Sequence, residues 1–188
     1  MTAEVTQNLR SDARDNRDRI LEVARAAFAA DGLDVSMREI ARRAEVGPAT
    51  LYRRFPTKEA LVVEVFSEQM AACAAAVGAG LEHADAWEGF RHTVEEVCVV
   101  HVLNRGFAAA FLTAFPAAID FAAVRSTAFR QLAELVRRAK ATGRLRADFT
   151  VDDLVLLLMA SSGVRVATPA AARRFATLFL EGAAGRPR

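Results

Sequence analysis

Basic side chains gather in one short part of this 188-residue chain, between Ser36 and Lys58. This segment has six basic side chains against two acidic ones, whereas residues 59–188 carry equal numbers of each and the whole chain has a formal net charge of +2. A local excess of positive charge is typical of a surface that neutralises phosphates. The same pattern also fits an ordinary solvated helix face, and charge alone does not separate the two. The basic residues are Arg38, Arg42, Arg43, Arg53, Arg54 and Lys58.

Residue types that enzymes use are present, but their spacing forms no recognisable catalytic or metal site. His83, His92 and His101 follow one another at intervals that match no zinc-binding motif. The chain has no glycine-rich phosphate loop and no Gly-x-Ser-x-Gly motif. Cys98 lies one helical turn before His101 and can touch it, but a cysteine on an apolar stripe usually packs as a small hydrophobe. We expect no enzyme activity, no metal and no cofactor.

Composition indicates an all-α protein of one or two domains. The hydrophobic fraction is 53%, while Tyr and Trp occur once each and Pro five times, which argues against an all-β sandwich or barrel. Two cysteines are too few for a disulfide scaffold and indicate a reducing, cytoplasmic location. The longest uncharged stretch, residues 106–119, is shorter than the roughly 20 residues of a membrane span. Residues 1–19 are polar and charged, unlike a signal peptide.

Apolar periodicity and capping residues predict a helix over residues 15–30 and two short helices after it. Gly32 suits the left-handed end of the first helix, and Ser36 begins the second as part of a Ser-x-x-Glu capping box. Residues 44–47 interrupt that helix, and Pro48 suits the first turn of the third. Two short helices joined by a four-residue turn, with basic residues on the second, are a helix-turn-helix signature.

The remaining chain is also predicted to be helical. Thr57 caps a fourth helix, and apolar stripes run along residues 87–101 and 121–139. A further helix is predicted over residues 150–166, and Thr168 with the following proline begins the last one.

Residues 31–61 resemble the DNA-binding signature of the TetR family (TetR/AcrR) of bacterial transcriptional regulators, and their sequence is DGLDVSMREIARRAEVGPATLYRRFPTKEAL. Together with the preceding helix, RILEVARAAFAADG, the likeness covers residues 17–61, and its T-L-Y-x-x-F-x-x-K-E-x-L run is highly specific. The rest of the chain is similar to the family in length and helix rhythm. The resemblance implies a helix-turn-helix DNA-binding domain over residues 1–56 and a helical regulatory and dimerisation domain over residues 57–188.

The resemblance also implies which residues contact DNA. The second helix of such a pair lies in the major groove with its N-terminal residues toward the base edges. Ser36 is expected to cap helix 2 and touch phosphate, and Arg38 to contact phosphate or the minor groove. Thr57 with Lys58 matches the family's phosphate clamp at the start of helix 4. Whether Arg53 reads guanine or pairs with phosphate stays open. The predicted DNA contacts are Ser36, Arg38, Gly47, Pro48, Ala49, Thr50, Tyr52, Arg53, Thr57 and Lys58.

The segment departs from the usual family pattern in three ways. The loop before helix 2 is one residue shorter. Glu45 stands where the family usually has glycine, and a non-glycine residue at positive φ costs about 1 kcal/mol, which predicts a strained turn. Arg53 and Arg54 replace residues that are Tyr and His in many members, so the operator sequence is not predicted.

These features predict a sequence-specific DNA-binding transcriptional regulator, a repressor released from its operator by a small hydrophobic ligand of unknown identity. The alternative is a helical interaction protein that has kept the motif without using it on DNA. Salt dependence separates the two, because counterion release weakens DNA binding steeply between about 50 and 200 mM salt.

A homodimer is predicted through the last two helices, because residues 154–159 are apolar on every side. The alternative is a fully buried core helix. A two-fold dimer matches a palindromic operator, with recognition helices about 34–36 Å apart or a little more. The predicted interface residues are Leu154, Leu157, Leu158, Ser161, Phe175, Leu178 and Phe179.

The resemblance further implies a ligand pocket between helices 4, 5, 7 and 8. Aromatic and methionine side chains give an adaptable apolar wall, and His101 with Asn104 and Arg105 can orient one polar group of a ligand. The alternative is that these side chains have only a structural role and fill the core. A pocket under about 300 Å³ argues against a drug-sized effector. The predicted lining residues are Met70, Phe90, Val94, Val97, His101, Phe111, Phe129 and Met159.

Overall fold

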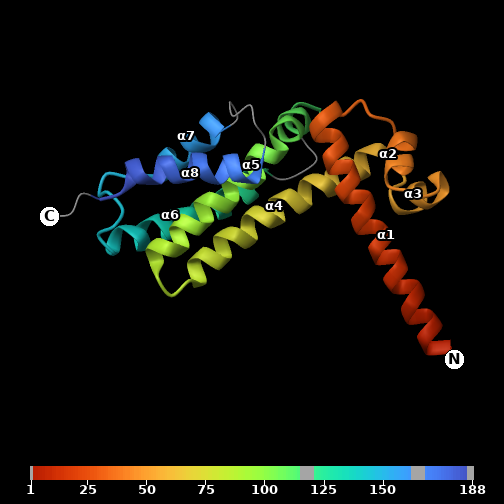
Figure 1. Ribbon diagram of the computed structural model, residues 1–188, viewed down its shortest axis with the longest axis horizontal. Coiled ribbons are helices and arrows are strands. Elements are labelled where there is room, and N and C mark those ends of the chain that lie inside the picture. Colours follow the sequence, from red (N-terminus) through yellow and green to blue (C-terminus); the bar gives the residue numbers. More distant parts are fainter. Residues whose placement is uncertain (1, 115–120, 162–167, 186–188) are drawn as a thin grey trace. The chain divides into compact units, whose positions relative to one another are not determined.

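The computed structural model describes the backbone of residues 2–114, 121–161 and 168–185, and within these ranges the protein is all-α, as predicted. The only extended pairing in these ranges is an isolated antiparallel bridge between Leu145 and Ala184. The helices are α1 (Thr2–Asp31), α2 (Met37–Arg43), α3 (Pro48–Arg54), α4 (Lys58–Glu82), α5 (Ala86–Ala114), α6 (Phe121–Ala141), α7 (Val151–Ser161) and α8 (Pro169–Ala183) (Figure 1).

The chain forms two compact units. The N-terminal unit comprises residues 1–68 and 106–118, and the C-terminal unit comprises residues 69–105 and 119–188. The sequence predicted a division between residues 56 and 57, at the start of the fourth helix. Packing instead assigns the first half of α4 to the N-terminal unit, because Phe66 stacks on Phe111 with ring centroids 4.1 Å apart. Phe28 of α1 stacks on Phe107 in the same way, at 5.5 Å.

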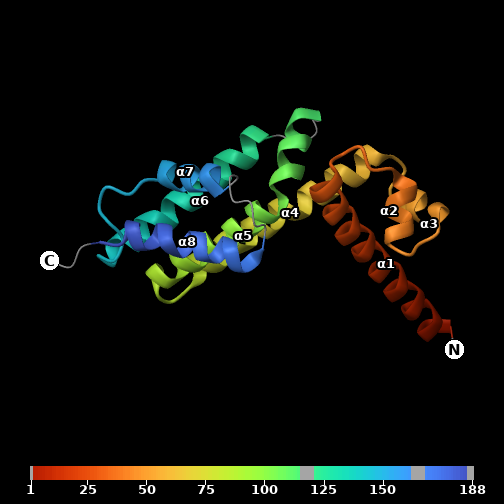
Figure 2. The ribbon, with the colours of Figure 1, turned by 45° about the horizontal axis from the view of Figure 1, so that its top comes forward.

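In the N-terminal unit, α1 is longer than predicted. It begins at Thr2, not near residue 15, and in both views its N-terminal part extends beyond the two short helices α2 and α3 (Figures 1 and 2). Apolar periodicity detects only the packed part of a helix, where Ile20, Ala24 and Phe28 are fully buried. Residues 2–14 have no such stripe, and this is why the predicted start was wrong.

The C-terminal unit has a core built from α5, α6, α7 and α8, and the predicted apolar stripe of α5 supplies much of it. Gly143 follows the end of α6 with φ 74°. The Thr168 hydroxyl accepts a hydrogen bond from the Ala171 N–H at the start of α8, as expected from the sequence. The end of the predicted helix over residues 150–166 lies outside the described residues. The buried core side chains include Trp87, Phe90, Val94, Cys98, Leu135, Val136, Ala139, Leu145, Phe149, Leu154, Leu157, Ala176 and Leu180.

Two glycines that the sequence analysis did not single out let α4 and α5 approach closely. A Cβ atom on Gly80 would lie 2.7 Å from the carbonyl oxygen of Gly89, and a Cβ on Gly89 would overlap the carbonyl of Gly80. The Thr93 hydroxyl closes the crossing with a hydrogen bond of 3.1 Å to the Ala76 carbonyl. A side chain at either glycine would therefore force the two backbones apart.

Among the described helices, α4 is long and apolar enough in composition to cross a membrane. This is weak evidence for a span, because the core helix of a soluble protein has the same character. Leu61, Val62 and Val65 of α4 are buried in the N-terminal unit, and Val77 is buried in the C-terminal unit. These four side chains belong to protein cores, and a third of the apolar stretch of α4 is buried in all.

We predict that Gly89→Ala destabilises the protein by about 1–3 kcal/mol, because the added methyl group overlaps backbone atoms that have no room to move. The matched control is Gly78→Ala, at a helical position with nothing within 4 Å of the new atom. That substitution is expected to stabilise by about 0.4–1 kcal/mol. Urea unfolding midpoints check both, and equal effects of the two substitutions would contradict the close crossing.

Candidate DNA-binding surface

The second helix begins with the predicted serine cap. The Ser36 hydroxyl accepts a hydrogen bond of 3.2 Å from the Glu39 N–H. The other half of the predicted capping box is wrong, because the Glu39 carboxylate binds Arg42 at 2.7 and 2.8 Å and Arg43 at 2.8 Å instead. A charged partner on the next turn outcompetes the backbone N–H for the same oxygens.

The turn between α2 and α3 requires a left-handed backbone conformation that is costly for a non-glycine residue. Glu45 has a φ of 54°, which confirms the predicted left-handed residue. The Glu45 N–H bonds the Arg42 carbonyl at 3.2 Å, and the Val46 N–H bonds the Ala41 carbonyl at 3.0 Å. This pair of bonds is a Schellman motif, which satisfies the last carbonyls of α2 and sets the direction of the chain into α3.

Two buried side chains anchor α3, and its other side chains are accessible to solvent. Gly47 caps it in an extended conformation, and Pro48 occupies its first turn. Leu51 is fully buried and Phe55, just after the helix, is 5% exposed. Tyr52 is 44% exposed. The predicted recognition residues therefore share the outer face of α3.

The start of α4 lies next in the chain and has the predicted cap. The Thr57 hydroxyl accepts a hydrogen bond of 3.1 Å from the Ala60 N–H. Thr57 is exposed and Lys58 is half-exposed. The first N–H groups of a 25-residue helix and an adjacent lysine are suited to hold a phosphate, as the predicted clamp requires. Of the other predicted DNA contacts, Ser36, Arg38, Gly47, Pro48, Ala49 and Arg53 are exposed, and Thr50 is half-exposed.

The charges of this surface are less uniform than the sequence indicates. Hydrogen bonds from Arg42 and then Arg43 lower the pKa of Glu39 to about 2. Arg43 also pairs with Asp31 at 2.6 Å. In the described part of the chain, Arg38, Arg53 and Lys58 have no carboxylate partner, so these three cations can meet phosphates or bases without first breaking such an ion pair.

The predicted ligand-pocket residues are not brought together in one cavity. Val94 and Val97 line a small apolar cavity of about 30 Å³ between α5, α6 and α7, which we call the α5–α7 seam; its other walls are Thr93, Cys98, Leu132, Leu154, Leu157 and Leu158. Phe90 is fully buried in the core of the same unit. Half-buried His101 bonds the Leu158 backbone, and burial lowers its pKa.

The other four predicted lining residues lie elsewhere. Phe111 belongs to the N-terminal unit, where it packs on Phe66. Phe129 and Met159 are surface residues, 40% and 67% exposed. Met70 of α4 is half-buried. Helical periodicity shows that a stripe is apolar, but it does not show into which unit the stripe packs. In α7 both the inner and the outer face are apolar.

The predicted dimer residues divide into an inner and an outer set. Leu154, Leu157 and Ser161 are at most 5% exposed and belong to the core of the protomer, so their assignment to an interface is wrong. Leu158, Phe175 and Phe179 are half-buried and Leu178 is 50% exposed. The sequence analysis missed Leu156, which is 60% exposed on the outer face of α7. Its position two residues after Leu154 is the signal that separates the two faces.

We predict that Glu45→Gly stabilises the protein by about 1 kcal/mol relative to Glu45→Ala, because only glycine adopts a φ of 54° without strain. Both substitutions remove the same charge, so their difference isolates the backbone. Thermal unfolding of the two variants checks this, and an alanine variant as stable as the glycine variant would show that the turn is unstrained.

Comparisons with known proteins agree with this architecture. Residues 20–65 match the family model of bacterial regulatory proteins of the tetR family, and residues 82–184 match the model of the SbtR-like transcriptional regulator C-terminal domain. An HTH-type transcriptional regulator of Staphylococcus aureus (strain USA300) is 38% identical over 63 residues, which are 33% of this chain and 34% of the relative. The match thus spans about a third of the curated relative.

Solved structures resemble nearly the whole chain. A TetR transcription regulatory protein from Mycobacterium vanbaalenii is 31% identical, with a TM-score of 0.70 over 94% of this chain and 99% of that one. The TetR transcriptional regulator SCO0520 from Streptomyces coelicolor is 30% identical, with a TM-score of 0.68 over 91% and 99%. The chain therefore belongs to the tetR family of bacterial regulatory proteins, which are transcriptional regulators and not enzymes.

Proposed function

We propose that this protein is a repressor that binds a palindromic operator as a homodimer and leaves it when a small hydrophobic ligand binds. The observation that carries the DNA-binding part is the outer face of α3. Leu51 and Phe55 hold the helix by its inner face, and Tyr52 and Arg53 point to solvent. A helix presented in this way fits the major groove of DNA.

The end of α3 that approaches the bases is built from small residues. Gly47 and Ala49 are exposed and have little or no side chain, so the backbone can come close to the base edges. Arg38 precedes this tip in the chain and Lys58 follows it, and each is assigned a phosphate on one side of the groove. Tyr52 and Arg53, one turn further along α3, are assigned base or backbone contacts.

We predict that Lys58→Ala weakens binding to every DNA sequence alike and lowers the slope of log affinity against log salt by about one. Arg53→Ala tests base reading: loss of a guanine contact reduces discrimination at one base pair by about 1–3 kcal/mol. Arg130→Ala, which removes an exposed cation of the C-terminal unit, is the matched control. Fluorescence anisotropy on operator variants measures all three.

Two outcomes of that experiment would change the account. If all operator variants weaken equally in Arg53→Ala, Arg53 pairs with phosphate and does not read a base. If wild-type affinity is the same at about 50 and 200 mM salt, the protein does not bind DNA through its phosphates, and the alternative of a helical interaction protein is favoured.

The outer face of α7 and α8 supports the homodimer. The two helices pack against each other, and Leu156, Met159 and Leu178 project from them with exposed fractions of 60, 67 and 50%. Large apolar side chains gathered on two adjacent helices mark an interaction surface. A second copy of the same face is the simplest cover, since a two-fold interface uses one patch twice.

We predict that Met159→Asp and Leu178→Asp each convert the dimer to monomer, because an interface buries no unpaired carboxylate without a large penalty. Phe129→Asp is the control, since Phe129 is also an exposed apolar residue, at 40%, but lies on α6. Sedimentation velocity at micromolar protein measures the result. A wild-type monomer, or dissociation by the Phe129 variant alone, would contradict this interface.

The effector is proposed to enter the C-terminal unit along the α5–α7 seam. The seam's volume of about 30 Å³ is far below the roughly 300 Å³ expected of a drug-sized effector site, which counts against binding in this conformation. The proposal therefore requires that binding displaces side chains and selects a more open conformation. Within the described part of this unit, two buried amide oxygens, Gln69 Oε1 and Asn104 Oδ1, have no hydrogen-bond donor. Neither residue lines the seam. A ligand that extends beyond the seam and brings a donor to either oxygen would remove an unfavourable interaction.

We predict that Val97→Phe, which fills the seam, raises the effector concentration needed for operator release at least tenfold and leaves operator affinity unchanged. The control is Val155→Phe, at a half-buried position that does not line the seam. Release of labelled operator by a panel of apolar molecules with one hydrogen-bond donor measures the response. An unchanged response of Val97→Phe would place the effector elsewhere.

A further inference from the structure

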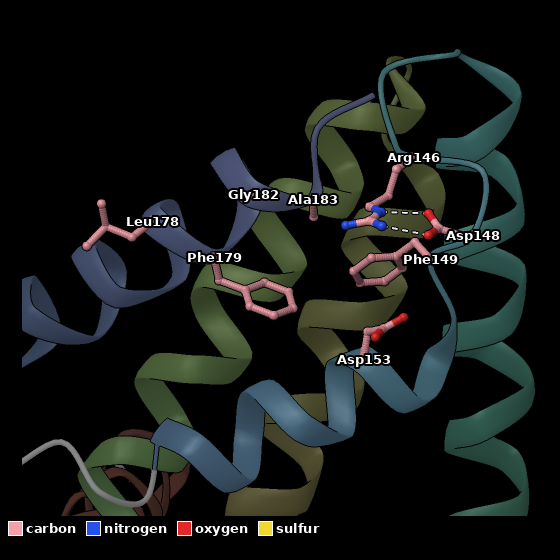
Figure 3. A pocket seen from close by; sticks show the side chains of 8 residues that line it. All are labelled: Arg146, Asp148, Phe149, Asp153, Leu178, Phe179, Gly182 and Ala183. Carbon is pink, nitrogen blue, oxygen red and sulfur yellow. Dashed lines mark hydrogen bonds and ion pairs between the residues drawn. The ribbon is translucent and has the colours of Figure 1, made fainter. Parts of the chain in front are cut away.

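A second and larger cavity lies beside the first turn of α7 and shares no lining residue with the α5–α7 seam. Its volume is about 400 Å³, within the range of small-molecule sites. Figure 3 shows that it is framed by the first turn of α7, the last two turns of α8 and the segment that connects α6 to α7. The residues that line it are Arg146, Asp148, Phe149, Asp153, Leu178, Phe179, Gly182 and Ala183.

One side of the cavity is aromatic. The rings of Phe149 and Phe179 meet edge to face, with centroids 6.2 Å apart. Phe149 is held from behind by Phe90, at 5.6 Å, and is 3% exposed, so this wall is fixed by the core. Gly182 adds space next to it, since a Cβ there would meet nothing within 4 Å.

The other side of the cavity is charged, and its cation is already paired. Arg146 donates two hydrogen bonds of 2.6 Å to the carboxylate of Asp148, drawn as dashed lines in Figure 3. Asp153 Oδ2 accepts from the backbone N–H of Thr150 at 2.7 Å and from its hydroxyl at 2.9 Å. Both bonds end on the same oxygen, so within the described part of the chain Oδ1 is left to accept from a molecule in the cavity.

These walls favour a cation over an anion. Two carboxylates and one guanidinium line the cavity, and an anion would have to displace Asp148 from Arg146 while facing Asp153. A cation can pair with Asp153, and the apolar part of the same molecule can lie against the aromatic side of the cavity. The acidic residues in the first turn of α7, Asp152 and Asp153, offset the positive end of its helix dipole.

We propose that this cavity is a binding site for a small organic cation, with the cationic nitrogen at Asp153 and an apolar group against Phe149 and Phe179. The site is distinct from the α5–α7 seam, and one of its lining residues, Leu178, also belongs to the dimer face proposed above. It gives the C-terminal unit a second ligand site of different chemistry.

Three indole compounds that differ in charge test this proposal on the DNA-free full-length protein: tryptamine (cation), tryptophol (neutral) and indole-3-acetate (anion). Isothermal titration calorimetry is expected to show tryptamine binding at least tenfold more tightly than tryptophol, and no binding of indole-3-acetate. Asp153→Asn, which keeps an oxygen for Thr150, is expected to remove the advantage of tryptamine. Asp152→Asn, on the adjacent exposed residue that does not line the cavity, is expected to keep it.

A cavity-filling variant keeps the test valid if Asp153→Asn does not fold. Gly182→Leu places a side chain in open space on a helix and is expected to abolish tryptamine binding without unfolding the protein. The proposal is overturned if tryptamine does not bind at millimolar concentration, if the three compounds bind alike, or if indole-3-acetate binds more tightly. Tryptamine binding unchanged by Asp153→Asn or by Gly182→Leu would also overturn it. Operator affinity, measured separately, reports on the repressor function alone.

Discussion

The burial of Leu51 and Phe55 decides what the DNA-binding surface presents. A helix of seven residues is too short to be stable alone, so α3 exists because these side chains pack on the unit beneath it. Once they are buried, the periodicity of the helix fixes every other side chain of α3, and Tyr52 and Arg53 must face outward. The Schellman turn at Glu45 then sets how α3 leaves α2. Helix length, packing and turn geometry together produce the candidate recognition surface.

Ion pairs on α2 refine that surface. Six basic residues follow one another between Ser36 and Lys58, but Glu39 and Asp31 engage two of them, Arg42 and Arg43. A cation paired with a carboxylate gains less from a phosphate, because the existing pair must first be broken. The cations proposed to meet DNA are therefore Arg38, Arg53 and Lys58, which flank or lie on the exposed face of α3. The arrangement fixes where the unpaired positive charges lie and does not raise the total charge of the surface.

Features set by local chemistry could be predicted from the sequence, and features set by packing between distant segments could not. The caps at Ser36, Thr57 and Thr168 and the left-handed Glu45 depend on a few neighbouring residues, and each is present as expected. In α7 the apolar residues surround the helix, so the sequence did not show that Leu154 faces the core and Leu156 the solvent. The cavity of about 400 Å³ joins residues from the α6–α7 connection, α7 and α8, and no local pattern connects them.

A hydroxyl-radical footprint of the full-length protein on the DNA upstream of its own gene tests the central claim, that the outer face of α3 enters the major groove as half of a two-fold dimer. At about 100 mM salt, the account predicts two protected patches related by symmetry on one face of the duplex, separated by about one helical turn or a multiple of it. Protection without defined boundaries, or no protection at protein concentrations at which the chain is fully dimeric, would contradict this claim.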